Sequence, residues 1–142
     1  MPDLITFLAC EKVIVDKADD IISIFNLLEK ITFVIPSGIA PSDVTDFPLS
    51  WSILTLWRNS GGEENKKYRQ RIELHSPQGQ IIPFSEDDWM FTSGQANHRL
   101  VFREDFFPVA PEGVWHLKLF LREIDATWEE KGSYPIELAY LK

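Results

Sequence analysis

Cysteine and long apolar runs are both scarce in this sequence. The 142 residues include one cysteine, Cys10, so the chain forms no internal disulfide, as is typical of proteins that fold in a reducing compartment. No apolar stretch approaches the roughly 20 residues that a membrane-spanning helix needs. Glu11 and Lys12 interrupt the apolar start of the chain before a secretory signal can form. We therefore expect a soluble, cytoplasmic protein.

Positive charge is also in short supply. The chain has 14 lysines and arginines against 22 aspartates and glutamates, a formal net charge of −8. Such a surface repels phosphate backbones and anionic lipid headgroups, so we predict that neither nucleic acid nor a membrane is a partner. The basic run at 66–71 directly follows Glu63 and Glu64, and we interpret it as a solvated loop and strand edge.

The composition is that of an ordinary globular chain. Hydrophobic residues make up 44% and charged residues 25% of the sequence, which sets disorder and fibrous structure aside. A chain of this length can bury a core without cross-links. No repeat or low-complexity linker divides it, so we expect one domain over residues 1–142.

Short segments of alternating polarity dominate the chain, as in half-exposed β-strands. The clearest is 115–122, where Trp115, Leu117, Leu119 and Leu121 share one register. Glycine and proline separate such segments at intervals of roughly 10–15 residues, the spacing of β-sandwiches and barrels. The sequence thus predicts an all-β fold, an antiparallel β-sandwich of about eight strands.

Three segments are harder to interpret. Segment 4–15 is apolar in both registers, which predicts a strand that is covered on both faces or bent, with a bulge near Cys10. Segment 21–31 fits a strand, which we favour for its β-branched residues, or one short helix. Segment 36–48 contains three prolines, and we expect a long, candidate functional loop.

Three motifs carry a resemblance to a known family. They are ACEKVIVD at 9–16, the turn SPQG at 76–79 and FPVAPEGVW at 107–115, in that order. Together they resemble a small, uncharacterised family of bacterial proteins, and the resemblance spans nearly the whole chain. It implies a β-sandwich and no assigned activity.

No residue pattern points to catalysis or to a cofactor. His75, His98 and His116 have neither the spacing nor the cysteine partners of a zinc site. Cys10 lies in an apolar strand, where burial favours an inert thiol. The pair Gly61-Gly62 precedes acidic residues that repel phosphate. We therefore predict no enzyme, no cofactor and no metal site.

Clustered carboxylates leave two alternatives open. An enzyme would need an acid pair such as Asp87 or Asp88 with Glu104 or Asp105. Calcium would need carboxylate oxygens gathered from several acidic loops; the aspartates and glutamates concerned are Asp16, Asp19, Asp20, Asp43, Asp46, Glu86, Asp87 and Asp88. We favour the simpler interpretation that these loops, including an acidic turn at 85–88, keep the protein soluble.

Two of the five tryptophans differ in their surroundings from the rest. Trp51, Trp57 and Trp115 occupy apolar registers and are expected in the core. Trp89 follows Asp87 and Asp88, and Trp128 precedes two glutamates, in segments that look like loops. We therefore predict that Trp89 and Trp128, with the two aspartates, are partly exposed contact residues for a partner or ligand.

The sequence as a whole favours a binding role. Our leading hypothesis is a non-enzymatic protein-interaction or scaffolding module that binds a protein partner or self-associates, because several strands are apolar in both registers. The alternative hypothesis is a sandwich that binds a small ligand or a carbohydrate through Trp89 and Trp128.

Overall fold

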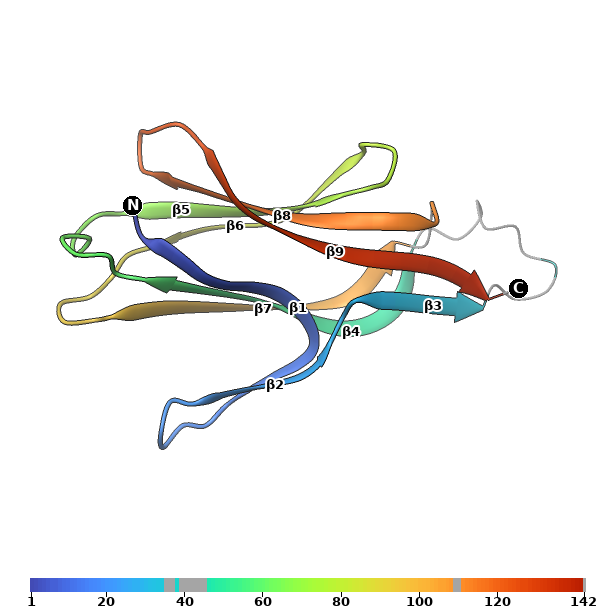
Figure 1. The fold of residues 1–142 in the computed structure, drawn as a ribbon, viewed down its shortest axis with the longest axis horizontal. Helices are drawn as coiled ribbons and strands as arrows, with labels where there is room; N and C mark the ends of the chain where they lie inside the picture. The colour runs from blue at the N-terminus through green and yellow to red at the C-terminus, as the bar shows by residue number, and fades with distance from the viewer. Residues whose placement is uncertain (35–37, 39–45, 109–110, 142) are drawn as a thin grey trace.

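The chain folds into two β-sheets that pack face to face (Figure 1). The structure is a computed structural model that describes residues 1–34, 38, 46–108 and 111–141. The four-stranded sheet contains, in spatial order, β2 (Ile22–Leu27), β1 (Asp3–Val15), β4 (Asp46–Arg58) and β7 (Asn97–Pro108). The five-stranded sheet contains β3 (Lys30–Val34), β9 (Glu129–Leu141), β8 (Gly113–Glu123), β5 (Tyr68–His75) and β6 (Ile81–Trp89).

The predicted all-β sandwich is confirmed. The described residues form nine strands and no helix, and every neighbouring pair is antiparallel except β3 and β9. The preference for strand over helix in 21–31 is also confirmed, because this segment supplies β2 and the start of β3. Asn26 has a φ of 52°, a left-handed conformation that no α-helix contains and that asparagine tolerates.

Tryptophans fill the space between the sheets, as predicted from their registers. Trp51, Trp57 and Trp115 are at most 1% exposed. Each indole N–H donates a hydrogen bond. Trp51 donates to the carbonyl of Phe106 at 3.0 Å, and Trp57 donates to Gln70 Oε1 at 2.7 Å. Trp115 donates to the carbonyl of Pro111 at 2.9 Å. Satisfying these donors lets large aromatic surfaces enter the core without a desolvation penalty.

Two segments predicted as loops contain strand. Strand β4 begins at Asp46 and includes Pro48, so the predicted loop at 36–48 is too long at its end; residues 36–37 and 39–45 lie outside the described residues. The acidic turn predicted at 85–88 is wrong, because these residues continue β6. Opposite charges explain the difference, since Arg69 and Arg71 of β5 face Asp88 and Glu86 across the strand pair.

Strand β1 is bent, and its second half leaves the sheet. It pairs with β4 only as far as Cys10, which lies opposite Ser52. The irregularity in this pairing falls between Leu4 and Thr6, so the bulge expected near Cys10 is misplaced. Beyond Cys10, β1 pairs only with β2, and the two strands with their turn form a two-stranded ribbon, residues 11–27, which we call the ribbon. Figure 1 shows the β2 end of the four-stranded sheet turned away from the five-stranded sheet.

The turn between β4 and β5 is anchored by a buried carboxylate. Glu63 is only 4% exposed and accepts hydrogen bonds from the Tyr68 hydroxyl, from Ser60 Oγ at 3.3 Å and from the Met1 amino group at 3.0 Å. The Nζ atom of Lys66 lies 3.9 Å from Glu63 Oε2. The turn at 59–65, which contains two glycines, is therefore held against the end of the core.

Replacing this carboxylate tests the anchor. We expect Glu63→Ala to lower the free energy of unfolding by about 1–3 kcal/mol, because the buried Tyr68 hydroxyl loses its acceptor. Denaturant unfolding measures the change. The exposed Glu123 at the end of β8 supplies the control, Glu123→Ala, for which we expect a change within about 0.5 kcal/mol. Equal effects of the two substitutions would contradict the anchoring role.

Candidate functional site

Trp89, predicted as a contact residue, belongs to the core. It is 6% exposed, and its ring centroid lies 4.6 to 5.9 Å from those of four other rings, namely His98, Tyr68, Phe91 and Trp57. The expectation that Trp89 is partly exposed is therefore wrong. Because β6 continues through the acidic residues, Trp89 lies opposite Tyr68 on the inner side of the sheet, where the sequence pattern alone predicted a loop.

Trp128 is half-buried on the outer face of the five-stranded sheet. The guanidinium carbons of Arg71 and Arg122 lie 4.4 and 4.7 Å from its ring centroid. These distances are those of cation–π contacts. The indole surface that a ligand would need is thus already in contact with two cations.

Asp87 and Asp88 do not join the two tryptophans in one site. Asp88 accepts hydrogen bonds from Arg69 at 2.6 and 3.1 Å, and this contact holds the pKa of Asp88 below its usual value. Asp87 lies opposite Gln70 in the register. Arg69 in turn lies opposite Arg122, and Arg122 contacts the ring of Trp128. Asp88 and Trp128 therefore lie on the same face of the sheet, but these two arginines stand between them.

The other groups considered for chemistry are engaged in packing or ion pairs. Cys10 is fully buried, and burial raises the pKa of its thiol, which agrees with an inert packing residue. His98 stacks on Trp89 with an interplanar angle of 4°. Asp20 pairs with Arg99 at 2.8 Å. Among the residues that the structure describes, no three His, Cys, Asp or Glu side chains are placed to hold a metal ion; Asp43 lies outside that set.

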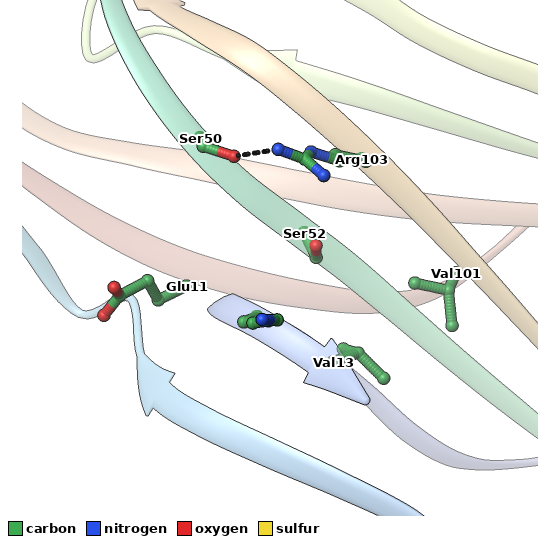
Figure 2. Close-up of a pocket in the computed structure, with 7 residues that line it drawn as sticks. Glu11, Val13, Ser50, Ser52, Val101 and Arg103 are labelled. Atoms are coloured by element: carbon green, nitrogen blue, oxygen red, sulfur yellow. Dashed lines mark hydrogen bonds between the residues drawn. The ribbon is translucent and has the colours of Figure 1, made fainter. Parts of the chain in front are cut away.

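A groove that sequence reasoning missed lies between the ribbon and the outer face of the four-stranded sheet. Its volume is about 340 Å³, and its lining residues are Glu11, Lys12, Val13, Ser50, Ser52, Val101 and Arg103. Figure 2 shows Glu11 and Val13 of the ribbon on one side and Ser50 and Arg103 on the other. Arg103 donates a hydrogen bond to Ser50 Oγ at 3.1 Å.

The ribbon is held at its tip as well as at its base. Arg99 of β7 pairs with Asp20 in the turn, and a second hollow of about 400 Å³ separates this end of the ribbon from β4 and β7. Within the ribbon, Glu11 Oε2 accepts a hydrogen bond from Asn26 at 2.6 Å, and at its base the Leu28 amide donates a hydrogen bond to the Ala9 carbonyl at 2.9 Å. These contacts give the ribbon a defined position while space remains beneath it.

Exposed apolar side chains are concentrated on the ribbon. Among the described residues, 14 large hydrophobic side chains are exposed, and the ribbon carries six of them, at 39–62% exposure: Ile14, Val15, Ile21, Ile24, Phe25 and Leu27. The sequence signal for this surface is the apolar character of 21–27, part of the segment whose β-branched residues favoured strand over helix. A two-stranded ribbon has no second layer to bury both of its faces.

The molecule is thus a nine-stranded β-sandwich, counted over the described residues, with an apolar ribbon arched over a polar-rimmed groove. No protein-family model matches the chain, and no curated protein matches it. The resemblance to a bacterial family stays a prediction. Within the described part of the chain, no helix has the length and hydropathy needed to cross a membrane.

The two tryptophans should differ sharply when each is replaced by alanine. We expect Trp89→Ala to cost about 3–5 kcal/mol of stability, because it empties the centre of an aromatic cluster. Trp128→Ala removes two partly exposed cation–π contacts and should cost only about 1–2 kcal/mol. Chemical denaturation followed by circular dichroism compares them. A similar loss in both variants would contradict the assignment of Trp89 to the core and Trp128 to the surface.

His98 should make stability depend on pH. Burial lowers the pKa of His98 from its ordinary value of about 6.5. The imidazole therefore binds a proton more readily in the unfolded chain than in the folded protein. Stability should therefore fall as the pH drops below that ordinary value and level off below the folded pKa.

His98→Phe tests this dependence, because it keeps a ring beside Trp89 without a titrating nitrogen. The measurement is the free energy of unfolding of both proteins between pH 8 and pH 5. We expect the stability of the variant relative to the natural chain to rise as the pH falls. A difference that does not change with pH would contradict the shifted pKa.

Proposed function

We propose that this chain is a non-enzymatic protein-interaction module of the cytoplasm that binds a protein partner, or a second copy of itself, through the ribbon. The observation that carries the proposal is the concentration of exposed apolar side chains on residues 11–27, with Phe25 at 46% and Leu27 at 52% exposure. The pairing register places Ile14, Phe25 and Leu27 on one face of the ribbon and Val15 and Ile24 on the other, and exposed apolar side chains gathered in this way mark interaction sites.

The backbone of the ribbon supports the same role. Strand β2 lies at the edge of its sheet, so its outer side presents backbone N–H and C=O groups that no other strand of the described residues occupies. An added strand satisfies such groups through main-chain hydrogen bonds and gains specificity from pockets for its side chains. The groove beside the ribbon offers both apolar contacts, from Val13 and Val101, and polar contacts, from Arg103 and two serines.

The contacts of the other candidate groups support binding over catalysis. The thiol of Cys10 is buried, Asp88 is hydrogen-bonded to Arg69, and His98 is stacked on Trp89. Each group already has a structural partner. The net charge of −8 supports a partner that is not nucleic acid.

A carbohydrate site at Trp89 and Trp128 finds no support in the geometry. Trp89 is buried, and the ring of Trp128 contacts two guanidinium groups. A sugar would have to displace these cations before it could stack on the indole. We therefore base the function on the ribbon and not on the tryptophans.

Site-specific photo-crosslinking tests the proposal. A benzophenone amino acid at Phe25 should capture protein in a lysate of the source cells or in the pure protein, because an interaction surface brings another chain within reach of the ribbon. The same probe at Val114, which is 44% exposed on the other sheet, is the matched control. The readout is the ratio of crosslinked to free chain on denaturing gels.

The comparison between the two positions decides the outcome. Crosslinks at Phe25 that are absent or much weaker at Val114 would support the ribbon as the contact surface. Equal crosslinking at both positions, or none at either, would overturn the proposal.

A further inference from the structure

The groove between the ribbon and the four-stranded sheet has opposite charges on its two walls. Glu11 lies on the ribbon side, and Arg103 of β7 lies on the other side (Figure 2). Cys10, the neighbour of Glu11, is opposite Ser52 of β4, and Ser52 is opposite Arg103. Because neighbouring strands are about 4.8 Å apart, two strand spacings, roughly 9–10 Å, separate the backbones of the walls.

The two charged groups do not neutralise each other. Glu11 uses Oε2 to accept a hydrogen bond from Asn26, and Arg103 uses Nη2 to donate one to Ser50. Within the described part of the chain, Glu11 Oε1 and Arg103 Nη1 make no hydrogen bond. Asp105 lies 3.8 Å from Arg103 Nε, but both side chains are more than 70% exposed, so solvent weakens this pair. Each wall therefore keeps a free polar atom for a ligand.

A buried hydroxyl lies between the two walls. Ser52 is only 7% exposed, yet it lines the groove. Figure 2 shows it between the ribbon and Arg103. Its side chain has no hydrogen-bond partner among the residues that the structure describes. A buried polar group in this state carries a desolvation cost, which a polar ligand in the groove offsets.

The remaining lining limits the ligand in size and in charge. Val13 and Val101 provide apolar contacts, and the volume of about 340 Å³ is at the lower end of the roughly 300–1,000 Å³ of small-molecule sites. Lys12 also lines the groove, but its register with Phe25 places its side chain on the other face of the ribbon from Glu11. The groove thus fits a small molecule with both charges and a short apolar group.

We propose that this groove binds a free α-amino acid with a small apolar side chain. Arg103 and the hydroxyls of Ser50 and Ser52 bind its carboxylate, Glu11 binds its ammonium group, and Val13 and Val101 contact its side chain. This inference goes beyond the proposed function, because the ligand needs none of the six exposed apolar side chains of the ribbon.

The dimensions of an α-amino acid suit the groove. Its ammonium nitrogen and carboxyl carbon are about 2.5 Å apart, since each of the two bonds that join them is about 1.5 Å long. Charge-assisted hydrogen bonds add about 2.7–2.9 Å at each end. The ligand therefore connects protein groups roughly 8 Å apart, comparable to the two strand spacings between the walls.

Nuclear magnetic resonance titration of the full chain with L-valine tests the site. We expect saturable shifts of the backbone amides of Glu11, Ser50, Ser52 and Arg103. Two analogues each lack one charge of valine: 3-methylbutanoate has no ammonium group, and 2-methylpropylamine has no carboxylate. Each analogue should bind at least about tenfold more weakly than valine, because one charge of the groove stays without its partner. Neither analogue is larger than valine, so steric exclusion does not explain such a loss.

Exchanging the two charged residues separates their roles. Glu11→Gln and Arg103→Gln should each raise the Kd for valine at least about tenfold. Arg103→Gln should also weaken 3-methylbutanoate, whereas Glu11→Gln should not, because this analogue has no ammonium group. Glu123→Gln and Arg58→Gln are the matched controls, since both side chains are exposed and neither residue lines the groove. We expect both controls to bind valine as the natural chain does.

The outcomes are independent of those for the ribbon. Absence of a saturable shift with valine, or the same affinity in Glu11→Gln and Arg103→Gln as in the natural chain, would overturn the site. If 3-methylbutanoate binds as tightly as valine, the groove recognises a carboxylate alone and the assignment to an amino acid fails. Crosslinking from Phe25 still tests the proposed function in each case.

Discussion

The packing of aromatic side chains between the two sheets is the constraint on which the rest of the molecule depends. Trp51 and Trp57 project from β4 toward Trp115 and the apolar residues of β5 and β8. Because each of these indoles has a hydrogen-bond acceptor, the three tryptophans enter the layer without leaving their N–H donors unsatisfied. Every strand that faces this layer is thereby fixed in register, since a one-residue slip would turn its apolar side chains outward.

The ribbon shows what happens where this constraint ends. As far as Cys10, strand β1 is held between its neighbours and contributes buried residues such as Ala9. Beyond that point only β2 accompanies it, and among the described residues no further strand pairs with these two. The same apolar composition that builds a core elsewhere therefore stays exposed. Exposure of this surface is a consequence of topology and not of an unusual sequence.

Electrostatics organises the outer faces in a different way. On the five-stranded sheet, oppositely charged side chains of neighbouring strands form ion pairs, so that Arg69 contacts Asp88 at 2.6 Å and Lys118 contacts Glu130 at 3.3 Å. Two arginines, Arg71 and Arg122, also contact the ring of Trp128. The charged side chains of this face therefore pair with one another. The outer side of the four-stranded sheet instead has an arginine and two serines around a groove. The two faces of one sandwich thus have different capacities for binding.

Local pattern by itself determined the all-β class, the strands with clean alternation and the core positions of Trp51, Trp57 and Trp115, because period-two polarity depends only on neighbouring residues. It also favoured strand over helix in 21–31. Tertiary structure alone decided where Trp89 lies, because charge pairing with β5 extended β6 through three acidic residues. It likewise decided that the ribbon is uncovered, because burial depends on which strands meet across the sandwich, and distant segments of the chain supply those strands.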